Sequence, residues 1–210
     1  MNPKQRLLSH AVSVIEQDLL PLRLCKGHHS YAWPITEGFS GWFGLNTITA
    51  RGDGLVGINP IVGVICESIE DLLKKYDRAA RKGITPTIST SIGYLMPEKR
   101  YVEWLFDPNP DFDLEAEAQK IARAVRQFGV PFAEANASLA VVTANLEQLQ
   151  FTYRESAVYR LPIAYLLLGD RDRARECLAN ELRNIADRAN DVVNQYREFA
   201  AAFDQDALTA

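Results

Sequence analysis

The hydrophobic and polar positions of this chain follow different periods in its two halves. Residues 4–20 carry apolar side chains at helical spacing, and Pro21 ends the predicted helix. From 39 to 106 the pattern is typical of strands and turns, whereas almost everything after Asp111 has helical spacing. This segregation predicts an α+β fold with its sheet in the N-terminal half and a helical bundle packed with it in the C-terminal half.

The strand-like region predicts two hairpins. The first joins 41–50 to 55–66 through an Asp-Gly turn, and the second joins 85–94 to 100–106. The run 55–66 is apolar enough for a central, buried strand, and an Asn-Pro pair within it marks a bulge or a break. Together the two hairpins predict a four-stranded, mainly antiparallel sheet.

The helices are predicted from their caps and breakers. Residues 22–34 are expected to be irregular, and Ser68 followed by Asp71 is a capping pattern that predicts a helix to about Lys82. Glycines and prolines then separate four further predicted helices, over 113–128, 131–149, 154–168 and 171–203.

The domain organisation is predicted from one proline-rich connection. Two prolines in 107–112 cannot continue a strand or a helix, so this segment separates an α-ββ-α-ββ sub-region, 1–106, from a helical one, 113–203. Because a four-stranded sheet has to cover at least one face, the later helices are expected to pack on it. The chain is therefore predicted to be a single domain over 1–210.

Composition and charge narrow the possible functions. The net charge is −4, and no basic stripe provides the electrostatic footprint of a nucleic-acid-binding protein. Three widely spaced cysteines suggest no disulfide framework, which fits a reducing compartment. Neither a signal peptide nor an uninterrupted apolar run of ~18 residues is present, so no membrane association is expected. These features predict a cytoplasmic protein.

One segment carries metal-ligand residue types. Cys25, His28 and His29 have a Cys-x2-His spacing that occurs at zinc sites. A structural zinc site needs four ligands, however, and His10 and the other two cysteines are each solitary in sequence. A polar loop with an incidental buried cysteine explains the segment better, so neither a metal nor another cofactor is predicted.

A cluster of acids lies around the start of the helical half. It comprises Asp107, Asp111, Asp113, Glu115 and Glu117. Acids in a first helical turn offset the positive end of the helix dipole, and an N-cap aspartate satisfies free amides, so a structural role accounts for most of them. The same acids could instead bind a divalent cation or face a basic protein partner, and the last interpretation enters the predicted interface.

The densest aromatic stretch lies between Tyr31 and Phe43. Aromatic side chains fill a core where a sheet meets helices, but they also anchor protein interfaces. Tyr31 and Trp33 fall in the segment expected to be irregular, so they are predicted to lie on the surface and to contact a partner. No catalytic triad or phosphate-binding motif occurs in the chain, and no catalytic residue is predicted.

Two resemblances to known protein families occur in the chain, one in a single segment and one in a set of three segments. The segment Ala164–Leu178 resembles the turn between the helices of a tetratricopeptide repeat, without a second copy, which implies a closely packed helical hairpin. The segments Gly38–Asn46, Ile61–Leu73 and Gly93–Phe106 resemble small cytoplasmic immunity proteins of bacterial toxin systems, including polymorphic and type VI effectors. That resemblance implies an acidic α+β protein without catalytic motifs, which binds a cognate toxin domain and blocks its active site.

The leading hypothesis is therefore a non-enzymatic immunity protein that binds and neutralises a basic toxin domain through the acidic cluster and the two surface aromatics. Two alternatives remain open from the sequence. One is a helical adaptor or regulatory protein that docks through 154–203, and the other is an enzyme of unrecognised family using Cys25, His28, His29 or the carboxylates.

Overall fold

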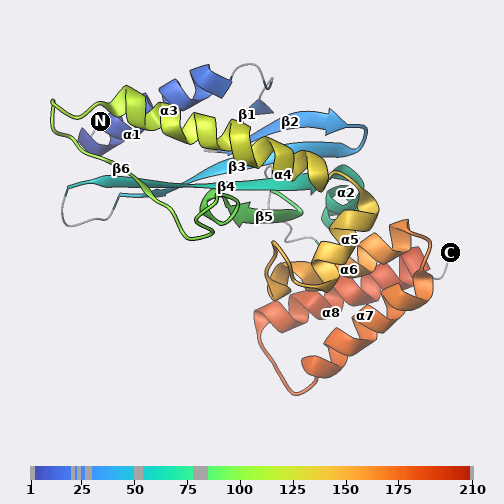
Figure 1. Ribbon diagram of the computed structural model, residues 1–210. Helices are drawn as coiled ribbons and strands as arrows, with labels where there is room; N and C mark the ends of the chain where they lie inside the picture. Colours follow the sequence, from blue (N-terminus) through green and yellow to red (C-terminus); the bar gives the residue numbers. More distant parts are fainter. Residues whose placement is uncertain are drawn as a thin grey trace. The chain divides into compact units, whose positions relative to one another are not determined.

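The protein is α+β, as predicted, and its parts fall into two compact units. A computed structural model describes residues 3–19, 22, 25–26, 30–49, 54–77 and 85–208. Unit 1 comprises Met1–Val64 with Ser89–Ala135, and unit 2 comprises Ile65–Ile88 with Asn136–Ala210. Figure 1 shows the sheet and the helices of both units. The expectation of a single domain stays a prediction.

Unit 1 is built on a mainly antiparallel sheet. In the described ranges the sheet has six strands: β1 (Cys25–Lys26), β2 (Ser30–Thr36), β3 (Phe39–Ile48), β4 (Val56–Cys66), β5 (Ile88–Ser91) and β6 (Trp104–Phe106). The strand order is β1-β2-β3-β4-β5, and β6 pairs with β4. The predicted N-terminal helix is confirmed as α1 (Pro3–Leu19), which buries Ala11, Ile15 and Leu19 at helical spacing.

The segment expected to be irregular contains a strand. β2 pairs antiparallel with β3, and the turn between them places Gly38 at a φ of 74°, where a side chain would be strained. Trp33 lies opposite Gly41, and a Cβ at Gly41 would overlap its indole ring. The Trp33 indole therefore packs against the backbone of Gly41. This contact forms only when β2 pairs with β3. The prediction of an irregular 22–34 is wrong for this reason.

The predicted second hairpin is also wrong. After β5 the chain forms a short 3-10 turn, Ile92–Tyr94, and β6 pairs antiparallel with the first three residues of β4 instead of with β5. The predicted pair 41–50 and 55–66 is confirmed as the neighbours β3 and β4. β4 runs unbroken through its Asn-Pro pair, and the buried Asn59 side chain donates to the Ser91 hydroxyl at 2.8 Å and the Val102 carbonyl at 2.6 Å.

One long helical segment of unit 1 continues where a break was expected. α3 (Leu114–Ala124) passes through a π-helical turn, Val125–Gly129, into α4 (Val130–Ala135). The wider turn carries the chain past Pro131, which has no amide hydrogen to donate, so the proline does not end the helix. α3 packs beside α1, and α4 contacts β3, so both helices cover the sheet (Figure 1).

Unit 2 is the helical bundle. It consists of α2 (Glu67–Tyr76), α5 (Leu139–Glu147), α6 (Arg154–Leu167), α7 (Arg171–Asn184), α8 (Asp191–Phe203) and a π-helical end, Asp204–Leu208. α6 packs against α2, α5 and α7, which places it at the centre of the unit. The hairpin implied by the tetratricopeptide-like segment is present as α6 and α7.

Three predicted helix bounds in this unit are corrected. α2 starts after Cys66, which makes no side-chain cap bond, so the capping pattern at Ser68 is not used; the predicted residues beyond 77 lie outside the described ranges. The prediction 131–149 is interrupted before α5, where Ser138 caps Val141. The prediction 171–203 divides into α7 and α8, because Asn190 caps a new helix.

Candidate functional site

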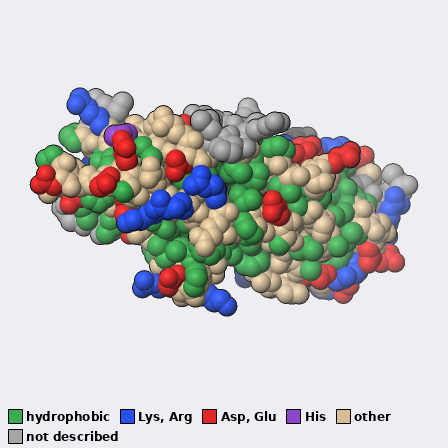
Figure 2. Space-filling view, turned by 45° about the horizontal axis from the view of Figure 1, so that its top comes forward, with side chains coloured by type: hydrophobic (Ala, Val, Ile, Leu, Met, Phe, Trp, Pro, Cys, Tyr) green, Lys and Arg blue, Asp and Glu red, His purple; other side chains and the backbone are tan. Residues whose placement is uncertain are grey.

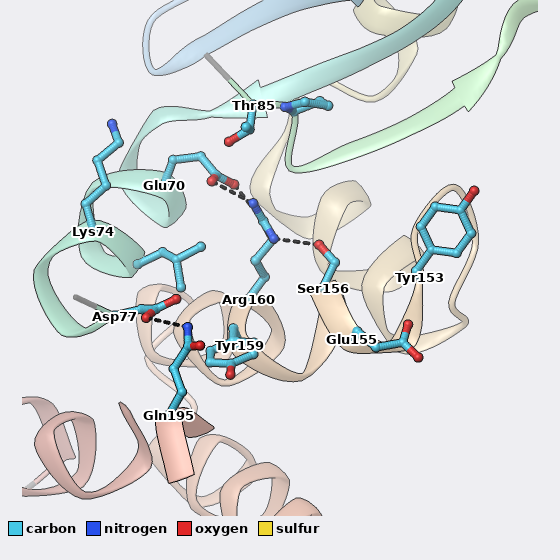
Figure 3. A pocket seen from close by; sticks show the side chains of 12 residues that line it. Glu70, Lys74, Asp77, Thr85, Tyr153, Glu155, Ser156, Tyr159, Arg160 and Gln195 are labelled. Atoms are coloured by element: carbon cyan, nitrogen blue, oxygen red, sulfur yellow. Dashed lines mark hydrogen bonds and ion pairs between the residues drawn. The ribbon is translucent and has the colours of Figure 1, made fainter. Parts of the chain in front are cut away.

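A cavity of about 560 Å³ in unit 2 is the candidate site (Figure 3). Its walls come from α2, from Thr85 and Pro86, from the first half of α6, and from Gln195 of α8. Among the lining side chains are three carboxylates and two cations: Glu70, Asp77, Glu155, Lys74 and Arg160.

One wall of the cavity is a buried ion pair. Arg160 donates to both carboxylate oxygens of Glu70, at 2.8 and 2.9 Å, and to the Ser156 hydroxyl at 2.5 Å. The side chains of Arg160 and Glu70 are only 11% and 7% exposed, so solvent screens this pair little. Thr87 donates a further hydrogen bond to Glu70 at 2.8 Å. The guanidinium charge is thus matched within the wall itself.

Aromatic and acidic side chains line another part of the cavity. The Gln195 side-chain amide donates to Asp77 at 2.9 Å, and Tyr159 also lines the cavity (Figure 3). Burial, followed by the negative charges of Asp77 and Glu181, raises the pKa of Tyr159 to about 12. The groups here that attract a cation are the carboxylates of Asp77 and Glu155 and the aromatic face of Tyr159.

The rim of the cavity exposes an aromatic ring. Tyr153 is 82% exposed and occupies the N-cap position of α6, where its side chain makes no capping bond. Glu155 is exposed beside it, in the first helical turn. The connection that leads to this rim holds Leu149 and Phe151 at positive φ values of 52° and 59°, a conformation that non-glycine residues rarely adopt.

This arrangement suits recognition of a basic side chain. Of the two lining cations, Arg160 is held by Glu70, and Lys74 is paired with Asp71 at 3.1 Å. In Figure 3 the Lys74 ammonium points away from Arg160 and the cavity centre. The lining therefore presents aromatic surface and carboxylates to an incoming group. Among the residues that the structure describes, no three His, Cys, Asp or Glu side chains are grouped as metal ligands.

The two aromatics predicted to contact a partner belong to the core. Tyr31 is 2% exposed and Trp33 is 4% exposed, so their predicted surface position is wrong. Tyr31 stacks on Phe43 with ring centroids 4.5 Å apart, and its hydroxyl donates to Glu16 at 2.7 Å. Burial and then Glu16 raise the pKa of Tyr31. Their burial follows from the strand β2, which the sequence pattern did not reveal.

The predicted acids lie in unit 1, and four of the five have a partner in that unit. The Asp107 carboxylate accepts from the Asn109 amide, and Asp113 caps α3 by accepting from the Ala116 amide at 2.9 Å. Glu117 pairs with Lys120 at 2.6 Å, Glu115 lies 3.9 Å from His10, and Asp111 is exposed. The cap at Asp113 is the structural role considered for this cluster.

The candidate zinc segment is largely outside the described part of the chain. His28 and His29 fall outside the described ranges, and Cys25 lies in β1 with its side chain not described. The sequence reasoning missed Tyr153 and Glu155 instead. A signal for Tyr153 was present, because it stands at a helix start where Ser, Thr, Asp or Asn is preferred. An aromatic residue there indicates a role other than capping.

A second ionic contact of unit 2 joins α2 to the C-terminal π-helical turn. Asp206 accepts from the Lys75 ammonium at 2.5 Å and from the Tyr76 hydroxyl at 2.9 Å. These two hydrogen bonds lower the pKa of Asp206 from its ordinary value of 3.8. Because the folded-state pKa is lowered, the contact contributes at pH values above 3.8 and is lost as the pH falls through the lowered value.

We therefore expect the Asp206 carboxyl to titrate below 3.8 and Lys75→Met to raise its midpoint towards 3.8. The measurement is a carbon-13 NMR titration of the side-chain carboxyl in both proteins. Lys74→Met, which removes the neighbouring cation on α2, serves as the control and should leave the midpoint of Asp206 unchanged. A midpoint at 3.8 in the unmodified protein would show that the contact does not form in solution.

The face of the molecule drawn in Figure 2 carries both signs of charge. Figure 2 shows acidic and basic side chains spread together over the visible face, with apolar groups between them. None of the helices in the described ranges combines the length and the apolar character needed to cross a membrane.

Comparison with known proteins adds no assignment: no family model, no curated protein and no solved structure matches this chain.

Proposed function

We propose that this chain is a protein-binding module that seats a basic side chain of its partner in the cavity of unit 2. The observation that carries the proposal is the rim of that cavity, where Tyr153 is 82% exposed next to the carboxylate of Glu155. Tyrosine is among the residues that dominate binding energy at protein interfaces, because a large ring is fixed by few rotatable bonds.

The charge of the lining supports a basic partner. Its two cations already have carboxylate partners, Glu70 and Asp71, whereas an incoming ammonium or guanidinium would meet Tyr159, Asp77 and Glu155. Opposite charge at a partly enclosed surface speeds association and favours the correct partner. We propose further that the partner is a toxin domain that this chain neutralises, which is the function implied by the resemblance to immunity proteins.

We expect Tyr153→Ala to weaken the partner complex by about 30-fold, the loss that corresponds to removing a binding hot spot of about 2 kcal/mol. Glu155→Gln should weaken the complex less than Tyr153→Ala does. Its effect should be larger at low salt than at high salt, because salt screens an exposed charge. The measurement is capture from the source organism's lysate by tagged protein, followed by titration of the purified partner. Inhibition of that partner's activity then tests the toxin assignment.

Val192→Ala and Glu176→Gln are matched controls, because both side chains are exposed on unit 2 and neither lines the cavity. They should bind within about twofold of the unmodified protein. A stoichiometric partner that Tyr153→Ala binds as tightly as the controls would overturn the cavity as the binding site. A partner without toxic activity would retain the binding function and overturn the immunity function.

A further inference from the structure

The exposed apolar surface of unit 1 is concentrated in one short stretch. Among its described residues, the large apolar side chains that are exposed are Tyr94 at 51%, Tyr101 at 49% and Leu105 at 38%. All three lie within 94–105, although unit 1 contributes more than a hundred residues to the chain. A concentration of exposed aromatic and apolar side chains is typical of interaction surfaces.

The backbone holds the two tyrosines on one closed loop. The Arg100 amide donates to the Gly93 carbonyl at 3.2 Å, so Tyr94 and Tyr101 each follow one of the two bonded residues. Within the loop, the Lys99 amide donates to the Met96 carbonyl at 3.0 Å, and Lys99 adopts a φ of 46°. We call residues 93–101 the tyrosine loop. A loop fixed by its own hydrogen bonds loses little conformational entropy when it binds.

The tyrosine loop is basic within an acidic protein. Lys99 and Arg100 are exposed next to Glu98, and neither cation forms an ion pair with a described residue. The chain as a whole carries a net charge of −4. The loop therefore combines two free cations with two half-exposed phenol rings. Arginine and tyrosine are both enriched where protein interfaces concentrate their binding energy.

We propose that the tyrosine loop is a second contact surface, which binds an acidic surface of a protein partner. A nucleic acid fits less well, because two cations fall short of the roughly 6–10 phosphate contacts of a typical DNA-binding protein. The surface lies on unit 1 and uses none of the residues of the cavity in unit 2. It therefore stands or fails independently of the function proposed for that cavity.

The experiment is an NMR titration of the full-length, nitrogen-15-labelled protein with a capped peptide of six glutamates. We expect the largest amide shifts at 93–105, with affinity falling as salt is raised. The double variant Lys99→Glu/Arg100→Glu should weaken binding by about tenfold or more, which corresponds to at least about 1.4 kcal/mol. Tyr94→Ala should weaken it as well, whereas Tyr153→Ala should have no effect.

The double variant Lys120→Glu/Arg123→Glu is the charge-matched control, because both residues are exposed on α3 of the same unit. It should bind the peptide like the unmodified protein. Peptide binding that survives Lys99→Glu/Arg100→Glu would overturn the proposal. So would tighter binding of a six-nucleotide thymidine strand at the same amides. Shifts that depend on protein concentration without peptide would overturn it too, because they would assign the loop to self-association.

Discussion

Replacing Arg160 by methionine is expected to lower the free energy of unfolding by about 3–5 kcal/mol, the usual effect of removing one partner of a buried ion pair. The variant would leave the Glu70 carboxylate, whose side chain is 7% exposed, with the Thr87 hydroxyl as its remaining side-chain donor among the described residues. The Ser156 hydroxyl would also lose the hydrogen bond that it accepts from Arg160. An uncompensated buried charge explains the size of the effect better than the loss of attraction does.

The double variant Glu70→Leu/Arg160→Met distinguishes these two causes. Removing both charges and filling the space with apolar groups should recover most of the stability that Arg160→Met loses. Lys74→Met is the matched control, because its ion pair with Asp71 is exposed and should contribute no more than about 1 kcal/mol. Urea unfolding followed by circular dichroism measures all three. A double variant as unstable as the single one would contradict the buried-charge explanation.

The parts of the fold that the sequence predicted depend on local pattern. α1 is visible in its helical spacing, and β3 and β4 are visible as strand-like patterns on either side of an Asp-Gly pair. The missed starts of α5 and α8 also had local signals, because Ser138 and Asn190 are ordinary capping residues. These errors came from treating a continuous helical pattern as one helix.

Other parts depend on contacts between distant residues and could not be predicted from local pattern. The pairing of β6 with β4 joins Phe106 to Val56 across 50 positions, and nothing near either residue specifies the other. The same holds for the candidate site, where Arg160 meets Glu70 from 90 positions away. The sequence shows acids and arginines on helices, but which of them are buried together is decided by packing.

Trp33→Ala is expected to lower the free energy of unfolding by about 3–5 kcal/mol, as usual when a large aromatic side chain is removed from a core. The indole is 4% exposed, lies over Gly41, and is 6.3 Å from the Phe43 ring. Since the contact with Gly41 involves backbone, neighbouring side chains cannot easily fill the space. Urea unfolding is the measurement, with Tyr153→Ala as an exposed aromatic control that should change stability by no more than about 0.5 kcal/mol.

A milder substitution at Tyr31, two positions before Trp33, distinguishes an effect on folding from an effect on binding. Tyr31→Phe keeps the stacking on Phe43 and removes only the hydrogen bond to Glu16, so stability should fall by about 1 kcal/mol while the fold is retained. Its affinity for the partner captured by the unmodified protein should be unchanged, because the ring does not reach the surface. If a folded Tyr31→Phe protein bound the partner more weakly, the binding site would lie in unit 1, as the sequence predicted, and not in the cavity of unit 2.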